Sequence, residues 1–198
     1  MTFYLGLTGG IASGKSTADE FFKKQGYDVI DLDEISHHLL EPHQASWEGV
    51  KSEFGPKFLK ADQTIDRKKL GQLVFSDIEE LKKLNAITHP AIMQEAQKQI
   101  QASQADLCVV DEPLLFEDGD QQKYDATLLI AIDPILQVKR LMARSQLTQQ
   151  AAKRRMEAQM PLRIKRKFAD YVVENNGSKA DLEMQLQDFI AKLPLKEK

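Results

Sequence analysis

The segment from Gly6 to Thr17 constrains the fold and the chemistry of this chain more than any other part of the sequence. Residues 9–16 read Gly-Gly-Ile-Ala-Ser-Gly-Lys-Ser, which matches the phosphate-binding pattern G-x-x-x-x-G-K-[ST]. The glycines permit a tight turn whose backbone N–H groups point at phosphate oxygens. Lys15 brings positive charge to the β- and γ-phosphates, and the Ser16 hydroxyl is a ligand for Mg²⁺. The segment therefore predicts a nucleoside-triphosphate site. The residues expected to contact the nucleotide are Gly9, Gly10, Ala12, Ser13, Gly14, Lys15, Ser16 and Thr17.

The residues on either side of this loop support the same interpretation. The apolar-rich run Phe3–Leu7 predicts a buried strand, and Thr17–Lys24 predicts a helix that begins near Lys15. A helix in this place directs the positive end of its dipole at the bound phosphates. Strand, loop and helix therefore follow one another in the order that the pattern requires.

Four further apolar runs predict the remaining strands of a parallel sheet. They are Tyr27–Asp31, Leu107–Asp111, Ala126–Ile132 and Tyr171–Glu174. Helical sequence separates these runs, and the alternation is typical of a doubly wound α/β fold. We expect a three-layer P-loop NTPase core with a parallel sheet, a helical acceptor-binding insertion and a helical lid. The expected limits are about 1–33, 89–134 and 169–198 for the core, 34–88 for the insertion and 135–168 for the lid.

Local signals predict where helices begin within the insertion and after it. Ser76-Asp77-Ile78-Glu79 is a capping box that predicts a helix reaching about Ala86. Pro90 suits the first residue of a second helix that extends to about Gln104.

The last third of the chain is mostly helical in character. Asp133 is expected to cap a long helical stretch with Pro134 in its first turn, and interruptions are expected near Ser145 and Pro161 before its end at about Phe168. The C-terminal helix has one apolar face, which we expect to be buried. The residues of this face are Leu182, Leu186, Phe189, Ile190 and Leu193.

The composition of the chain limits the kinds of molecule with which it is expected to interact. The formal net charge of −3 argues against a general nucleic-acid-binding surface, so we expect no nucleic-acid partner. Cys108 is the single cysteine, which excludes an intramolecular disulfide and fits a cytoplasmic, reducing setting; we expect it to be buried and inert. No apolar run approaches the ~18 residues of a membrane span, so we expect no membrane partner. We expect a monomer or a weak homo-oligomer.

Positive charge is concentrated between Gln137 and Lys167. This segment holds ten Lys and Arg residues and one acid, a net charge of +9 that leaves −12 for the rest of the chain. Three interpretations remain open. The residues form solvated helix faces, a mobile lid whose arginines close over phosphates, or a nucleic-acid-binding arm. The third is disfavoured because Phe168 is the only aromatic residue near the segment that could stack on a base.

Carboxylates follow two of the predicted strands. Asp31 and Asp33 come at the carboxyl end of a strand, where open α/β sheets bind ligands. Either could accept a proton from a substrate hydroxyl, and either could cap a helix. Asp111 follows four apolar residues and predicts an acid that holds Mg²⁺ directly or through water.

The histidines His37, His38, His43 and His89 lack the spacing of a metal site. His89 precedes Pro90 at a predicted helix start, where it could cap the helix or face a substrate pocket. Trp47 could equally be a core residue or a ligand contact.

Two elements decide between a nucleotide switch and an enzyme. A GTP-binding switch needs Asp-x-x-Gly to sense the γ-phosphate, and no glycine of this sequence follows an aspartate at that spacing. A guanine reader has the pattern [NT]-K-x-D, whereas residues 178–181 begin with serine. A small-molecule kinase needs a helical acceptor domain and a basic lid, and both are predicted here.

The sequence resembles the dephospho-CoA kinases over nearly its whole length. Besides the phosphate loop, the similar segments are Val29–Ile35, Ile65-Asp66-Arg67, Leu84–Ile92 with its His89-Pro90 pair, Pro113–Glu117, Arg140–Arg144, Gln159-Met160-Pro161 and Ala169–Asn175. Each segment is short, but all of them occur in the order of the family. Ala12 and Gln63 stand where the family usually has glycine, Leu32 where it has alanine and Asn85 where it has glutamate.

The resemblance implies a particular reaction. Members of the family use ATP with Mg²⁺ to phosphorylate the ribose 3′-hydroxyl of dephospho-CoA, which gives coenzyme A and ADP in the last step of coenzyme A biosynthesis. The implied substrates are ATP and dephospho-CoA. The implied residues are Asp33, Lys15, Arg140 and Arg144 for catalysis, Asn175 near the adenine, Asp33, His89, Leu115 and Glu117 for the acceptor, and Ser16 with Asp111 for Mg²⁺. In this scheme Asp33 is the catalytic base, and both arginines belong to the lid.

Overall fold

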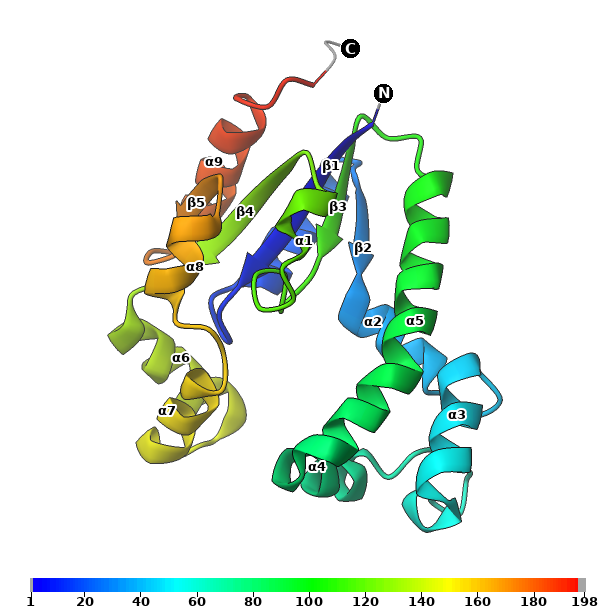
Figure 1. Cartoon of the computed structure of the whole chain (residues 1–198). Helices are drawn as coiled ribbons and strands as arrows, with labels where there is room; N and C mark the ends of the chain where they lie inside the picture. Colours follow the sequence, from blue (N-terminus) through cyan, green and yellow to red (C-terminus); the bar gives the residue numbers. More distant parts are fainter. Residues whose placement is uncertain (1, 196–198) are drawn as a thin grey trace. The chain divides into compact units, whose positions relative to one another are not determined.

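The computed structural model describes residues 2–195, apart from the side chain of Phe75 (Figure 1). The chain divides into two compact units, one formed by Met1–Ile30 with Ser103–Lys198 and the other by Asp31–Ala102. The outer limits of the expected core, Met1 and Lys198, lie outside the described residues.

A parallel sheet of five strands has the order β2-β3-β1-β4-β5. The strands are β1 Phe3–Gly9, β2 Asp28–Asp31, β3 Leu107–Asp111, β4 Ala126–Ala131 and β5 Tyr171–Glu174. Strand β1 pairs in parallel with β3 and β4, and β4 pairs in parallel with β5. Each strand matches a predicted one to within two residues at either end, so the predicted parallel α/β core is confirmed.

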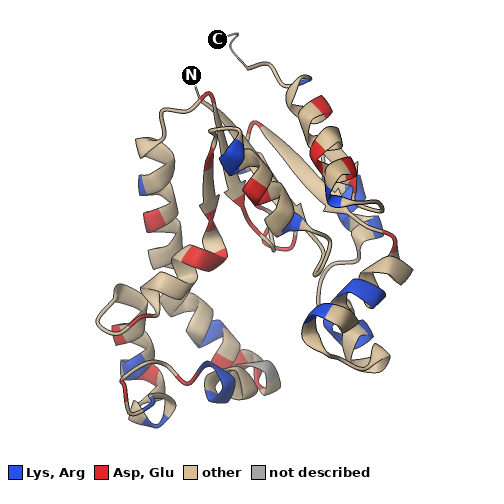
Figure 2. Ribbon diagram, turned by 180° about the vertical axis from the view of Figure 1, so that it is seen from behind, with Lys and Arg blue, Asp and Glu red and all other residues tan. Residues whose placement is uncertain are grey.

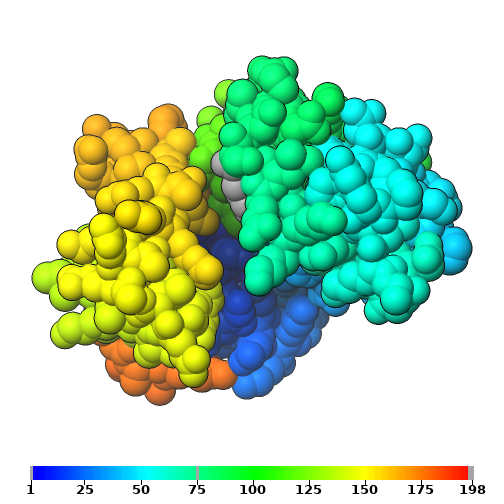
Figure 3. Space-filling model, turned by 90° about the horizontal axis from the view of Figure 1, so that it is seen from below, coloured from blue at the N-terminus to red at the C-terminus, as the bar shows by residue number. Residues whose placement is uncertain are grey.

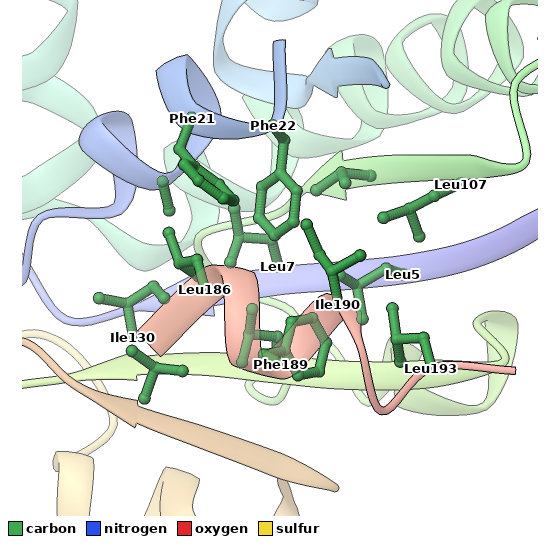
Figure 4. Close-up of a cluster of buried hydrophobic side chains, with 14 of the residues drawn as sticks. Leu5, Leu7, Phe21, Phe22, Leu107, Ile130, Leu186, Phe189, Ile190 and Leu193 are labelled. Carbon is green, nitrogen blue, oxygen red and sulfur yellow. The ribbon is translucent and has the colours of Figure 1, made fainter. Parts of the chain in front are cut away.

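One face of this sheet is covered by α1 (Lys15–Lys24) and α9 (Lys179–Ile190), which pack against each other. Alternate residues of a strand point to the same face, so Leu5 and Leu7 of β1 meet these helices together. Figure 4 shows Phe22 of α1 and Phe189 of α9 in the same buried cluster as Leu5 and Leu7. All five apolar residues expected on one face of the C-terminal helix are buried in the cluster, so that prediction is confirmed. Complete burial of one such side chain contributes about 1.5–3 kcal/mol.

The segment that follows β3 covers the opposite face of the sheet. A Cβ atom on Gly6 would come within 2.6 Å of the side chains of Leu115 and Tyr124, so this strand position leaves no room for a side chain. The helix α8 (Leu162–Phe168) packs nearby against β4. Cys108 is fully buried in β3, as predicted.

The basic segment forms three helices, α6 Pro134–Ser145, α7 Gln149–Glu157 and α8. The side chain of Asp133 accepts from the N–H groups of Ile135 and Leu136 at 2.8 and 3.1 Å, which confirms the predicted cap. The helices are interrupted after Ser145 and before Leu162, as expected.

The second unit is helical and has its own core. It contains α2 Leu32–Leu39, α3 Ala45–Phe54, η1 Pro56–Phe58, α4 Arg67–Ser76 and α5 Ile78–Ala102. Its buried cluster is Trp47, Val50, Phe54, Phe58, Ile65, Leu70 and Val74. Trp47 is 1% exposed and donates its indole N–H to the carbonyl of Gln63 at 2.7 Å, so it is a core residue.

The predicted break at Pro90 is wrong. A single helix, α5, runs from Ile78 to Ala102 with Pro90 inside it, and Figure 1 shows the helix changing direction along its length. Proline removes one backbone donor within the helix. The contacts of α5 with α2, α3 and α4 keep the helix continuous despite this loss. His89 consequently lies in mid-helix rather than at a helix start.

The predicted capping box is also displaced. Ser76 is the last residue of α4, and its hydroxyl donates to the carbonyl of Leu73. Asp77 takes the capping position of α5 instead, because its carboxylate accepts from the N–H of Glu79 at 2.9 Å. None of the described helices is long and apolar enough to cross a membrane.

Candidate active site

The phosphate loop joins β1 to α1 at the carboxyl edge of the sheet. Gly14 has a φ of 98°, in the left-handed region, and a Cβ on it would overlap the side-chain amide of Asn175. A Cβ on Gly9 would come within 2.5 Å of Ser13 Oγ. Both glycines of the motif are therefore required by space, and Gly14 also by backbone conformation.

Asn175 supports the loop from the end of β5. Its Nδ2 donates to the carbonyl of Ser13 at 2.7 Å, and its backbone N–H donates to the carbonyl of Ala131 at 2.8 Å. The residue is 5% exposed. The structure thus places Asn175 directly against the phosphate loop, and its contact with adenine stays a prediction.

Lys15 and Asp111 form the charged centre of the site. Their side chains make an ion pair between Lys15 Nζ and Asp111 Oδ2. Asp111 is 1% exposed at the end of β3, and the lysine extends from the first turn of α1. A buried carboxylate at this position balances the lysine charge and holds the lysine at the phosphate edge of the sheet.

The oxygen groups here suit Mg²⁺. The exposed hydroxyl of Ser16 and the carboxylate of Asp111 are hard oxygen donors, the kind that Mg²⁺ prefers. Among the described residues, no group of three or more His, Cys, Asp and Glu could hold a metal ion. Mg²⁺ in kinases typically keeps water and phosphate oxygens beside one or two protein ligands, so a pair of donors fits this ion.

Two glutamines hold the peptide groups of Ile11 in the loop. Gln159 Oε1 accepts from the N–H of Ile11 at 2.8 Å, and Gln137 Nε2 donates to its carbonyl at 2.8 Å. Figure 3 shows the yellow atoms of the α7 region beside the dark-blue N-terminal segment, in agreement with these bonds. Sequence reasoning did not assign these two roles. The Gln159-Met160-Pro161 segment was the only signal for Gln159, and Gln137 had none.

The basic residues of α6–α8 do not share one environment. Figure 2 shows Lys and Arg gathered on these helices. Arg140 is half-buried and donates to the carbonyl of Gly177 at 3.0 Å, whereas Arg144 is exposed. Lys165 has no exposed surface, so the interpretation as solvated helix faces does not hold for it.

Arg166 makes a two-pronged ion pair with Glu174 of β5, and one of its bonds measures 3.0 Å. The hydrogen bonds from Arg166 hold the pKa of Glu174 below its usual value. This pair fastens the end of the basic segment to the sheet.

The two candidate bases occupy different positions at the start of α2. The Asp31 carboxylate accepts from the N–H groups of Asp33 and Glu34, at 2.8 and 3.1 Å, so Asp31 caps α2. Asp33 stands in the first turn of that helix with an exposed side chain. Asp33 is thus the more exposed of the two residues, and its role as the catalytic base stays a prediction.

The expected acceptor residues occupy different environments. His89 is exposed on α5, as are His37 and His38 on α2. Leu115 is completely buried beneath Gly6, which favours a packing role over a substrate contact. Glu117 Oε1 accepts from the N–H of Met160 at 3.0 Å, and Glu117 Oε2 lies 3.0 Å from Lys165 Nζ.

The phosphate loop lies at the edge of a parallel sheet, its lysine pairs with a buried acid, and a basic helical segment is hydrogen-bonded to it. These features together define a P-loop kinase. The shikimate kinase of Acinetobacter baumannii, 13% identical with a TM-score of 0.54 over 99% of this chain and 97% of that one, shares the fold. The chain belongs to the dephospho-CoA kinase family, whose profile matches residues 3–181.

Individual relatives are similar to this chain over nearly its full length. The dephospho-CoA kinase of Lactobacillus johnsonii is 49% identical over 196 residues, which cover 98% of this chain and 99% of the relative. A Thermus thermophilus protein of known structure is 38% identical with a TM-score of 0.86, over 97% of this chain and 98% of that one. The Campylobacter jejuni dephospho-CoA kinase is 34% identical with a TM-score of 0.71, over 97% of each chain.

Proposed function

We propose that this chain transfers the γ-phosphoryl group of ATP to the ribose 3′-hydroxyl of dephospho-CoA. The products are coenzyme A and ADP, and the reaction is the last step of coenzyme A biosynthesis. The observation that carries the proposal is the ion pair between Lys15 and Asp111 beside the loop 9–16, in a chain of the dephospho-CoA kinase family.

The phosphate loop binds the triphosphate in this proposal. The N–H groups of residues 9–16 and the positive end of α1 surround the phosphates, and Lys15 adds a full charge. Because phosphoryl transfer spreads negative charge over the γ-phosphate oxygens, donors fixed in advance stabilise the transition state more than the ground state. Arg140 and Arg144 add charge from the basic segment.

Mg²⁺ would be held by Ser16 and Asp111 together with phosphate oxygens. When bound, the ion neutralises the phosphates and fixes the orientation of the triphosphate. The roles of this chain are to keep Ser16 on the first turn of α1 and to hold Asp111 beside Lys15.

In the proposed reaction Asp33 acts as the general base. Its carboxylate accepts the proton of the 3′-hydroxyl as the oxygen attacks the γ-phosphorus. The cap made by Asp31 supports this role, because it fixes the helix turn that carries Asp33 and leaves the Asp33 carboxylate exposed.

The setting and the assembly of the protein are also proposals. The single cysteine is buried, which suits the reducing cytoplasm. We propose that the protein acts there on small-molecule substrates, without nucleic acid or membrane, as a monomer or weak homo-oligomer.

The reaction is tested by incubating purified protein with ATP, MgCl₂ and dephospho-CoA and separating the products by chromatography. The expected result is equal amounts of ADP and coenzyme A. Adenosine and adenosine 5′-monophosphate serve as acceptor controls. Turnover of ATP at a rate that dephospho-CoA does not change would contradict the assignment.

A further inference from the structure

Lys165 is a charged residue in an environment that disfavours charge. Its side chain has no exposed surface, and its ammonium group donates to the carbonyl of Pro113 at 2.9 Å and lies 3.0 Å from Glu117 Oε2. Burial lowers the pKa of Lys165 in spite of Glu117. A methionine could fill the same space without the desolvation cost of a charge. Stability alone therefore does not explain a lysine here.

Glu117 holds the basic segment at two places. Its Oε2 pairs with Lys165 in α8, and its Oε1 accepts from the N–H of Met160 at 3.0 Å, in the connection between α7 and α8. One carboxylate thus binds both ends of the stretch 160–165. The carboxylate belongs to the segment after β3, which the sheet fixes through Pro113.

Two sets of hydrogen bonds connect Glu117 and Lys165 with the phosphate loop and the strand before it. Gln159 precedes Met160, and its side chain accepts from the N–H of Ile11. On the other side, the Pro113 carbonyl that binds Lys165 also accepts from the hydroxyl of Thr8 at 3.2 Å, in the strand that leads into the loop.

We propose that Glu117 and Lys165 are positioning residues that hold Gln159 on the Ile11 peptide and thereby set the phosphate loop for phosphoryl transfer. The role of Lys165 is to draw α8 onto the carboxylate, and the role of Glu117 is to place residue 160. This inference rests on the proposed function. It also gives Glu117 a role different from the acceptor contact that the family resemblance implies.

Steady-state kinetics separate the two roles of Glu117. Glu117→Ala, Lys165→Met and Gln159→Ala should each lower kcat about tenfold or more, with the KM for dephospho-CoA within about threefold of the parent. Glu117→Gln keeps an oxygen for the N–H of Met160 and should be less impaired than Glu117→Ala. A rise in the KM for dephospho-CoA in the Glu117 variants, with normal kinetics in Lys165→Met, would overturn the proposal.

The coupling of the pair gives a second test. Because both residues act on one connection, the double variant Glu117→Gln/Lys165→Met should have its kcat, relative to the parent, reduced by much less than the product of the two single reductions. Independent, multiplicative effects would contradict a shared role. Lys167→Met is the matched control, because Lys167 is an exposed lysine of the same helix, and it should leave every parameter unchanged.

Limited proteolysis needs no acceptor and no turnover. Trypsin cleavage after Arg154 or Arg155 in α7, followed by mass spectrometry, should be several-fold faster in Lys165→Met and Glu117→Gln than in the parent and in Lys167→Met. Equal cleavage rates in all four proteins would contradict the proposed holding of α7 and α8 by Glu117 and Lys165. Where Lys165→Met does not fold, shown by circular dichroism, Glu117→Gln carries the test. If the parent does not phosphorylate dephospho-CoA, the proposed function fails. The proteolysis still tests whether Glu117 and Lys165 hold the basic segment in place.

Discussion

Asn175 donates a hydrogen bond to the carbonyl of Ser13 at 2.7 Å, and both residues are buried. The bond joins the end of edge strand β5 to the middle of the phosphate loop. The same side chain fills the space that a Cβ on Gly14 would need. The shape of the loop therefore depends on a residue far away in the sequence.

We expect Asn175→Asp to weaken nucleotide binding and to lower the free energy of unfolding by about 1–3 kcal/mol. The change places a carboxylate oxygen against the Ser13 carbonyl and leaves both without a donor. The measurements are urea unfolding and titration of ATP and GTP by calorimetry. Support of the loop predicts a similar loss for both nucleotides. A loss confined to ATP would show instead that Asn175 contacts adenine.

Asp33→Asn should lower kcat about 10²-fold or more and leave the affinity for ATP nearly unchanged, because only the proton acceptor is removed. Asp31→Asn is the matched control. Asparagine caps helices as well as aspartate does, so this variant should keep its stability and most of its activity. An equal loss of ATP affinity in Asp33→Asn would make Asp33 a nucleotide or metal residue.

Much of the fold follows from local sequence. The strand–loop–helix order around the phosphate pattern, the five apolar runs and the cap at Asp133 each depend on residues close together in the chain, and the structure confirms them. The family and its reaction were also predictable, because several short motifs occur in order over the chain, and the family profile agrees. Local sequence does not distinguish Asp31 from Asp33, since either could cap the helix. The family resemblance favours Asp33 as the base, and this role stays a prediction.

The remainder depends on contacts between distant segments. The continuity of α5 through Pro90 results from its packing against three other helices, which local helix signals do not contain. The hydrogen bonds between Ile11 and the side chains of Gln137 and Gln159 join residues more than a hundred positions apart. Ala12 and Gln63, which stand where the family usually has glycine, have φ values of 60° and 66°, in the left-handed region that glycine adopts most easily.

Arg140→Ala should reduce kcat by about 10–10²-fold while lowering the free energy of unfolding by less than about 1 kcal/mol. The guanidinium is half-buried and donates a hydrogen bond to the carbonyl of Gly177, a contact whose loss costs little stability. Lys139→Ala, which removes the exposed neighbouring charge, is the control. Kinetics and urea unfolding are compared for both variants. Unfolding of Arg140→Ala at moderate temperature would assign the residue a structural role.

Activity should disappear on addition of excess EDTA and return with MgCl₂. Asp111→Asn should raise the Mg²⁺ concentration for half-maximal activity about tenfold or more, because it replaces a charged oxygen donor by a neutral one. The same change leaves Lys15 without its carboxylate. Asp188→Asn, on the exposed side of α9, controls for the loss of one negative charge. An unchanged Mg²⁺ requirement in Asp111→Asn would exclude Asp111 from the metal site.

Glu112 provides a pH-dependent test of the segment that covers the sheet. The carboxyl is 4% exposed, and Tyr124 donates its hydroxyl to Glu112 Oε2 at 2.7 Å. Burial, together with the nearby acid Asp120, raises the pKa of Glu112 to about 7. The hydrogen bond from Tyr124 and, more weakly, the charge of Lys123 act in the opposite direction. The folded state therefore favours the protonated carboxyl.

A carboxyl whose pKa is raised on folding contributes stability that is complete below its unfolded pKa of 4.5 and is lost as the pH rises to about 7. Glu112→Gln keeps an oxygen acceptor for Tyr124 and cannot ionise. Relative to the parent, this variant should gain about 2–3 kcal/mol between pH 4.5 and pH 8, with little further change above. Urea unfolding across this range, in EDTA and without nucleotide, measures the difference, and Glu79→Gln is the exposed control. Parallel stability curves for the parent and Glu112→Gln would show that Glu112 already ionises freely in the folded protein.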